Sequence, residues 1–131
     1  MFIDASALCS ILLGEEDAGP LADKIAAATS RTTSAVAVFE TVRAVLREAD
    51  GDADRVKNVV SDFLRVAEIR VVHIGSSELA AALDAMTRFG IGRHPAALNM
   101  GDCFAYACAR TSNEPLLFKG DDFSRTDIER A

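Results

Sequence analysis

The chain offers little aromatic or histidine chemistry. Its 131 residues contain no tryptophan, one tyrosine and two histidines. His73 and His94 are too few and too far apart for a structural zinc site. The chain also lacks the GxxxxGK(S/T), GxGxxG and GxSxG patterns. These absences argue against a P-loop, a dinucleotide-binding site and an α/β-hydrolase nucleophile.

Cysteines and long apolar runs are also scarce. Cys9, Cys103 and Cys108 are odd in number and form no CxxC pair, which is typical of reduced thiols in a cytoplasmic protein. No apolar run reaches the ~18 residues that a membrane-spanning helix needs. We therefore expect no signal peptide, no transmembrane helix, no membrane association and a cytoplasmic location.

The composition favours one domain with an aliphatic core. Half of the residues are hydrophobic, and the length suits a single domain over residues 1–131. The formal net charge of -6 and the pI of about 4.8 argue against a surface that binds nucleic acid everywhere. A local basic region is compatible with this charge, because arginines and lysines outnumber acidic residues between residues 85 and 120.

Short apolar segments alternate with amphipathic segments along the chain. The apolar segments predict strands at residues 1–3, 32–33, 69–74 and 116–118. Helical spacing and cap residues predict helices at residues 5–13, 20–28, 35–49, 77–89 (capped by Ser76) and 102–111, with polar residues from 120 onward. The alternation predicts an α/β fold with a mostly parallel central sheet, in which sites form beyond the carboxyl ends of the strands.

Residues 34–67 predict a helical hairpin. Its first helix follows Ser34, a good N-cap, and a turn at Asp50-Gly51 leads to a second helix that Asp52 or Asp54 begins. Helical spacing predicts an apolar stripe on each helix: Ala35, Val38, Phe39, Val42, Leu46 and Ala49 on the first, and Val56, Val59, Val60, Phe63, Leu64 and Ala67 on the second.

Asp4 is the strongest single candidate for a functional residue, because it directly follows a predicted buried strand. A carboxylate there is costly to desolvate unless it is paired or binds a metal. The alternative is an N-cap for the helix that begins at Ala5. Ser6 has two interpretations as well: its hydroxyl either orients Asp4 or bonds only to local backbone.

Further acidic positions complete the candidate set. Glu40 lies off the apolar stripe of its helix, where an ion pair with Arg43 is the simpler interpretation. Asp102 lies in the first turn of a helix, which favours an acid in any case, and apolar neighbours favour its burial. Asp121 and Asp122 follow a predicted strand and also suit a turn. Carboxylates at strand ends and helix starts can together hold Mg²⁺ or Mn²⁺.

In this order, these residues resemble a PIN domain, and more narrowly a VapC-type toxin ribonuclease of a bacterial type II toxin–antitoxin system. The resemblance covers nearly the whole chain. It rests on Glu40 and on three segments: Phe2-Ile3-Asp4-Ala5-Ser6-Ala7, Gly92 to Phe104 with Asn99-Met100-Gly101-Asp102-Cys103, and Leu116-Leu117-Phe118-Lys119-Gly120-Asp121-Asp122-Phe123. The last two segments are the most specific, because they are long and their residues follow a fixed order.

The resemblance implies a three-layer α/β/α fold with a protruding helical hairpin, and an endoribonuclease that depends on Mg²⁺ or Mn²⁺. It assigns catalytic and metal-binding roles to Asp4, Glu40 and Asp102. The Asp-Phe pair of the family's ending points to Asp122 as the fourth acid, with Asp121 as the alternative. It also implies a homodimer and a cognate VapB-like antitoxin that inserts a chain into the active groove and grips the helical hairpin. A higher assembly with the antitoxin is compatible with it.

A cluster of acids without its metal repels itself, so we expect raised carboxylate pKa values in the metal-free protein. We expect single-stranded or looped RNA as the substrate, because specific recognition of RNA favours exposed bases. The candidate phosphate contacts are Arg43, Arg93, His94 and Lys119, although each alone is more often a surface charge.

Two other functions fit part of this pattern. A catalytically inactive PIN-like domain would only bind RNA or protein, but this chain keeps every candidate acid. A phosphoryl-transfer domain of the haloacid-dehalogenase type would use Asp4 as a nucleophile. It would be expected to carry a second aspartate two residues later, where this chain has Ser6.

Overall fold

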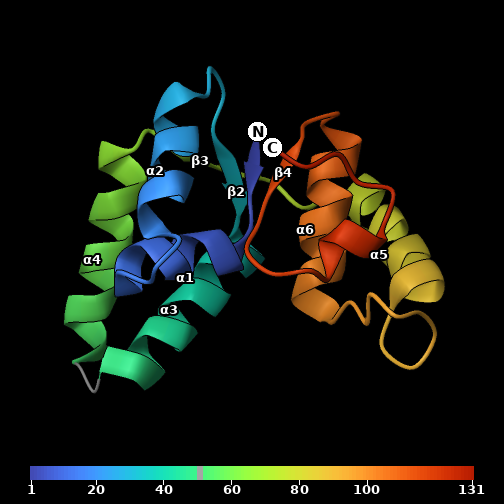
Figure 1. Cartoon of the computed structure of the whole chain (residues 1–131), viewed down its shortest axis with the longest axis horizontal. Helices are drawn as coiled ribbons and strands as arrows, with labels where there is room; N and C mark the ends of the chain where they lie inside the picture. Colours follow the sequence, from blue (N-terminus) through green and yellow to red (C-terminus); the bar gives the residue numbers. More distant parts are fainter. Residues whose placement is uncertain (50–51) are drawn as a thin grey trace.

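In the described residues 1–49 and 52–131 of a computed structural model, four short strands form a central sheet between two layers of helices (Figure 1). The strands are β1 (Phe2–Ile3), β2 (Thr32–Ser34), β3 (Arg70–Val72) and β4 (Leu116–Leu117). Their order is β3-β2-β1-β4, and each neighbouring pair is parallel. The α/β class and the parallel sheet predicted from the sequence are confirmed.

The helices cover both faces of the sheet, as Figure 1 shows. One layer consists of α1 (Ala5–Leu13), α2 (Ala18–Ala27), α3 (Ala35–Ala49) and α4 (Ala53–Val66), and the other of α5 (Ser76–Phe89) and α6 (Met100–Thr111). A short 3-10 helix, η1, spans Phe123–Arg125. None of the helices in the described residues combines the length and the apolar composition that crossing a bilayer requires.

Alternate side chains of β1 and β4 enter different cores. Phe2 and Leu116 pack into the core beneath α5 and α6, whereas Ile3 and Leu117 pack into the core beneath α1 to α4. This alternation is the period-two pattern of a strand that is buried on both faces. A charged side chain at the end of such a strand therefore needs a hydrogen bond, an ion pair or a cation.

Most helix bounds agree with the sequence prediction, and three starts differ for local reasons. The Leu21 N–H donates to the Asp17 carbonyl (3.1 Å), so α2 begins at Ala18, two residues before the predicted start. Helix α6 begins at Met100, two residues before the predicted start, because Asn99 caps it. Helix α5 begins at Ser76, and Gly75 takes the cap position because its N–H donates to the Glu78 carboxylate (2.8 Å). The predicted turn at Asp50-Gly51 lies outside the described residues.

The predicted apolar stripes of the hairpin are only partly correct. Ser34 caps α3 as predicted, because its hydroxyl accepts the Ala37 N–H (3.2 Å). However, Phe39 is 68% exposed, and α3 buries Ala37, Thr41 and Val45 instead. Helix α3 contacts α1, α4 and α6, so its buried face is shared among three helices rather than turned toward α4 alone. On α4 the predicted Val56, Val60 and Leu64 are buried, whereas Val59 is 47% exposed.

The polar tail closes the sheet beside β4, which its composition did not predict. The Leu116 N–H donates to the Glu129 carbonyl (2.8 Å), and the Ala131 N–H donates to the Leu116 carbonyl (3.0 Å). Phe123 of η1 is buried against Phe118, with ring centroids 5.0 Å apart. The tail thus covers the edge of the sheet and part of the core.

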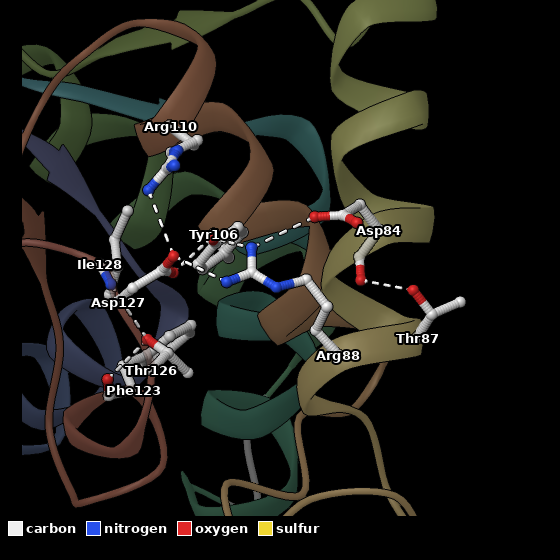
Figure 2. Close-up of polar contacts among 9 residues, drawn as sticks. All are labelled: Asp84, Thr87, Arg88, Tyr106, Arg110, Phe123, Thr126, Asp127 and Ile128. Carbon is white, nitrogen blue, oxygen red and sulfur yellow. Dashed lines mark hydrogen bonds and ion pairs between the residues drawn. The ribbon is translucent and has the colours of Figure 1, made fainter.

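Asp127 anchors this tail to α5 and α6 (Figure 2). The Tyr106 hydroxyl donates to one carboxylate oxygen of Asp127 (2.6 Å), and Arg88 pairs with the other (2.8 Å). Arg110 approaches the same oxygen at 3.6 Å, and Arg88 also pairs with Asp84 (3.3 Å). The hydrogen bond from Tyr106, and next that from Arg88, hold the pKa of Asp127 below its usual range.

We expect Tyr106→Phe to lower the free energy of unfolding by about 1 kcal/mol at neutral pH, because the Asp127 carboxylate loses a buried donor. The pKa of Asp127 is lowered in the folded state. Its stabilising contacts are therefore present above the unfolded pKa of 3.8 and are lost as the pH falls through the folded value. Urea unfolding at neutral and acidic pH measures both effects.

The matched control for this prediction is Thr87→Ala. The Thr87 hydroxyl is exposed and bonds only to the Asp84 carbonyl of its own helix (2.8 Å). An exposed bond of this kind contributes little to stability. Equal unfolding midpoints for wild type and Tyr106→Phe would contradict the proposed anchoring of the tail.

Candidate active site

Asp4 is a buried acid at the carboxyl end of β1. Its N–H donates to the Leu117 carbonyl of β4 (2.9 Å), and its side chain is 4% exposed. One carboxylate oxygen accepts the Ser6 N–H (2.9 Å) and the Ser6 hydroxyl (2.6 Å). Burial raises the pKa of Asp4 despite these bonds, and the charge of Asp122 raises it further. Asp4 therefore caps α1, as one interpretation of the sequence predicted, and it is also a desolvated acid.

Ser6 connects the ends of β1 and β4. Its hydroxyl donates to Asp4 (2.6 Å) and accepts the N–H of Lys119 (3.0 Å), two residues after β4. The first of these bonds fixes the Asp4 carboxylate, and the second holds the chain after β4 against α1. Ser6 thus does more than bond to its local backbone.

Glu40 reaches from α3 to the first turn of α6, where its carboxylate lies against Gly101. Burial raises the pKa of Glu40, and the charge of Asp4 raises it further, whereas the charge of Arg43 lowers it. The sequence favoured a solvated ion pair between Glu40 and Arg43. In the described part of the chain, the carboxylate is instead half-buried and directed toward α6.

Asp102 is the third residue of α6 and forms a reciprocal cap with Asn99. The Asn99 N–H donates to the Asp102 carboxylate (2.8 Å), and the Asp102 N–H donates to the Asn99 side-chain oxygen (3.1 Å). Burial raises the pKa of Asp102 to about 6, with additional contributions from the charges of Asp4, Asp122 and Glu40. Asp102 is therefore a capping residue and also a member of the acid cluster.

Asp121 and Asp122 both lie on the surface after β4. Their carbonyls accept N–H groups of η1: Asp121 from Ser124 (3.1 Å) and Asp122 from Arg125 (3.3 Å). The charge of Asp122 raises the pKa of both Asp4 and Asp102. The turn interpretation thus holds for both residues, and Asp122 also lies close enough to the cluster to act on it.

The chemistry of this cluster fits a divalent metal ion. Its oxygen donors suit Mg²⁺ or Mn²⁺, and a bound cation would offset both the burial and the mutual repulsion that raise the pKa values of Asp4, Glu40 and Asp102. Within residues 1–49 and 52–131, however, no three His, Cys, Asp or Glu side chains are gathered at metal-binding distances. Asp4 bonds to Ser6, and Asp102 accepts the Asn99 N–H, through one carboxylate oxygen each, so these bonds leave the second oxygen of either acid unused.

Lys119 lies at the edge of the cluster and is held by acids of the segment before α2. Its ammonium group pairs with Glu15 (2.8 Å) and Asp17 (3.4 Å). These groups are substantially exposed, so the pairs are weak and a phosphate could replace them. Ser6 fixes the Lys119 backbone beside Asp4, which keeps the side chain near the site.

The other basic candidates differ in how firmly they are held. Arg43 and Arg93 are exposed, and Arg43 is close enough to Glu40 to lower its pKa. The His94 ring packs edge-on against Phe89, with centroids 5.2 Å apart, and its Nδ1 accepts the Ala96 N–H (3.1 Å). His94 therefore orders the loop between α5 and α6, whatever its role toward RNA.

Asn99 and Gly101 contribute to the site in ways that the sequence prediction missed. Asn99 is the N-cap of α6 and fixes the backbone of Asp102. The spacing from Asn99 to Asp102 is that of a capping box and was a usable signal. The contact between Gly101 and Glu40 joins two helices, and no local pattern indicates it.

Comparisons with known proteins agree with this geometry. A family model described as the PIN domain matches residues 1–129. A VapC ribonuclease of Rhizobium meliloti (strain 1021) is 38% identical over 139 residues, covering 97% of this chain and 98% of the relative. Ribonuclease VapC of Mycolicibacterium smegmatis is 39% identical over 128 residues, covering 98% of this chain and 97% of that relative.

A solved structure shows the same fold. Mycobacterium tuberculosis VapC20, described as a toxin that cleaves the sarcin-ricin loop, matches with a TM-score of 0.77 at 17% sequence identity. The match covers 99% of this chain and 97% of that chain. The likeness confirms the predicted layered arrangement, with the sheet between two groups of helices.

Proposed function

We propose, since the chain belongs to the PIN domain family and within it to the VapC ribonucleases, that it is an endoribonuclease toxin whose cleavage of RNA depends on Mg²⁺ or Mn²⁺. The observation that carries the proposal is the acid cluster at the carboxyl ends of the strands. There burial, and in addition the charge of Asp4, raise the pKa of both Glu40 and Asp102. A divalent cation relieves such repulsion.

Asp4, Glu40, Asp102 and Asp122 are the residues that would hold the metal. When bound, Mg²⁺ or Mn²⁺ would supply an activated water and neutralise charge on the phosphate. The chain itself excludes solvent from Asp4 and fixes its carboxylate through Ser6. The Asn99 cap holds the backbone of Asp102, so a preorganised scaffold positions the acids.

We propose single-stranded or looped RNA as the substrate. The structurally similar VapC20 is described as cleaving an RNA loop, and exposed bases are the parts of RNA that proteins read most readily. Arg43, Arg93, His94 and Lys119 are the proposed phosphate contacts around the site. The single tyrosine, Tyr106, is buried, so it provides no base-stacking surface.

We propose a VapB-like antitoxin as the partner in the cytoplasm, gripping the hairpin of α3 and α4. Phe39, Val59 and Val66 of this hairpin are 68%, 47% and 71% exposed. Large apolar side chains that face solvent on neighbouring helices mark surfaces that bind other chains. The antitoxin would then cover apolar surface on α4 and on α3, the helix that carries Glu40.

A homodimer is also proposed. Its supporting observation is an apolar groove between α5 and α6, bordered by exposed side chains of 44–69% accessibility. These side chains are Leu79, Leu83, Met86, Ile91 and Met100. Self-association would remove this surface from water.

One observation favours the second candidate function, an inactive PIN-like module that binds RNA or protein. The carboxylates of the described residues do not form a ready ligand set as they stand. In that case the protein would bind its partner without binding Mg²⁺ or Mn²⁺ at the cluster. Metal binding by the protein therefore separates the two functions.

The deciding experiment uses purified antitoxin-free protein and pooled cellular RNA. We expect cleavage with Mg²⁺ or Mn²⁺, none with EDTA, and recovery when excess metal is added back. Isothermal titration with Mn²⁺ should detect binding to the same preparation. Folded protein that binds no Mn²⁺ and cleaves no RNA would favour the inactive module.

The fourth acid is tested by paired substitutions. We expect Asp122→Asn to weaken Mn²⁺ binding and reduce cleavage by at least about 10-fold, because the charge of Asp122 reaches both Asp4 and Asp102. Asp121→Asn makes the same isosteric change at the neighbouring residue, and it should change Mn²⁺ binding and cleavage much less. The opposite order of effects would assign the role to Asp121.

A further inference from the structure

Gly101 and Glu40 are in unusually close contact. Gly101 is the buried second residue of α6, and Glu40 lies on α3. A Cβ atom added at Gly101 would overlap both carboxylate oxygens and the carboxylate carbon of Glu40, all nearer than the 3.0 Å that real Cβ atoms keep. The Glu40 carboxylate therefore fills the space that any other side chain at position 101 would need.

The glycine is not required by the backbone. The positive-φ glycines of the described residues are Gly14, Gly92 and Gly120, whereas Gly101 lies within a regular helix. Glycine is unfavourable there, because only proline forms helices less well. The three atoms nearest to the added Cβ all belong to the flexible Glu40 side chain. Alanine would thus suit the helix but displace the carboxylate.

Gly90 shows the contrasting case. A Cβ atom there would meet the backbone of Met86, with its carbonyl oxygen nearest and two further backbone atoms at 3.2 and 3.3 Å. Such a clash with backbone makes a glycine necessary for the fold. At Gly101 the three nearest atoms belong instead to the Glu40 side chain, an acid of the proposed site.

We propose that Gly101 is a positioning residue, whose missing side chain lets Glu40 place its carboxylate against the first turn of α6 next to Asp102. The inference rests on the proposed function, in which both acids hold the metal ion. Asp102 is the residue after Gly101, and its backbone is fixed by the Asn99 cap. The glycine thus lets Glu40 of α3 lie beside Asp102 of α6.

The test compares Gly101→Ala with Gly19→Ala. Gly19 is also the second residue of its helix, α2, but a Cβ atom there would meet nothing within 4 Å. We expect both variants to keep or raise the melting temperature of the metal-free protein. Only Gly101→Ala should weaken Mn²⁺ binding by titration calorimetry and lower kcat/KM, each by about 10- to 100-fold, as for outer-shell residues of metal sites.

A double-mutant cycle excludes a purely structural role. Glu40→Asp shortens the acid by one methylene and withdraws it from position 101. Adding Gly101→Ala in that background should therefore cost much less Mn²⁺ affinity than it does in wild type. Three results would overturn the inference. They are an equal loss of Mn²⁺ affinity in both backgrounds, a wild-type Mn²⁺ affinity in Gly101→Ala, or a lowered melting temperature of Gly101→Ala that accounts for its loss of affinity. Wild-type protein that binds no Mn²⁺ would overturn the proposed function, and this inference with it.

Discussion

Asp4→Asn is expected to reduce metal-dependent RNA cleavage by about 10²- to 10³-fold or more, the usual effect of losing one group that stabilises transition-state charge. Asparagine keeps the shape of the side chain. Its oxygen can still accept the bonds from the Ser6 N–H and hydroxyl, so the cap of α1 survives. The variant removes the negative charge and replaces one carboxylate oxygen by an NH2 group, while it keeps the cap.

Two further substitutions make this result specific. Asp23→Asn changes an exposed acid of α2, away from the cluster, and should cleave like wild type. Asp4→Ala also removes the cap and should be about 1 kcal/mol less stable than Asp4→Asn, which keeps it. Cleavage is measured by the initial rate on one labelled RNA at saturating Mn²⁺. Wild-type rates for Asp4→Asn would exclude the acid cluster as the catalytic site.

The parts of the fold that the sequence predicted well are those with local signals. The bounds of α1 follow from Asp4 as a cap and from Gly14, which ends the helix in a left-handed conformation (φ 65°). The strand end after Ile3 follows from a short apolar run, and β4 ends at Leu117, one residue before the end that its apolar run predicted. Because parallel strands end at one edge of a sheet, these signals also predicted where Asp4 would lie.

The parts that the sequence did not predict depend on contacts between distant segments. Phe39 fits the helical stripe of α3, yet α3 packs against α1, α4 and α6 through other side chains and leaves Phe39 in solvent. The tail looks polar, but Asp127 binds Tyr106 and the backbone pairs with Leu116. The position of Glu40 depends on Gly101, 61 positions later in the printed sequence. Spacing within one helix carries none of this information.

Asp102→Asn is expected to stabilise the metal-free protein at pH 7.5 while it abolishes cleavage. Burial and neighbouring acids raise the pKa of Asp102 from 3.8 to about 6, so its ionised form is disfavoured in the folded state. A shift of about two units corresponds to roughly 3 kcal/mol. Because the group is partly exposed, we expect a gain of about 1–2 kcal/mol. Asparagine can still accept the Asn99 N–H, so the cap of α6 remains.

The pH dependence gives this prediction its sign. Below the unfolded pKa of 3.8, Asp102 is protonated in both states and has no effect on stability. Between 3.8 and about 6 the folded state holds the proton more tightly, so metal-free wild type should lose stability as the pH rises. Asp4 and Glu40, whose pKa values are also raised, should act in the same direction. The lowered pKa of Asp127 makes stability rise with pH instead, but at pH values below 3.8.

Urea unfolding in EDTA at pH 4 and pH 7.5 measures the effect. Wild type and Asp102→Asn should unfold at similar urea concentrations at pH 4, and the variant should be the more stable at pH 7.5. Excess Mn²⁺ at pH 7.5 should then raise the stability of wild type well above its EDTA value, because the ion binds only the folded site. The variant should gain far less. If the variant is less stable than wild type at pH 7.5, Asp102 acts mainly as a helix cap. The ionised acids of the cluster then do not destabilise the metal-free protein.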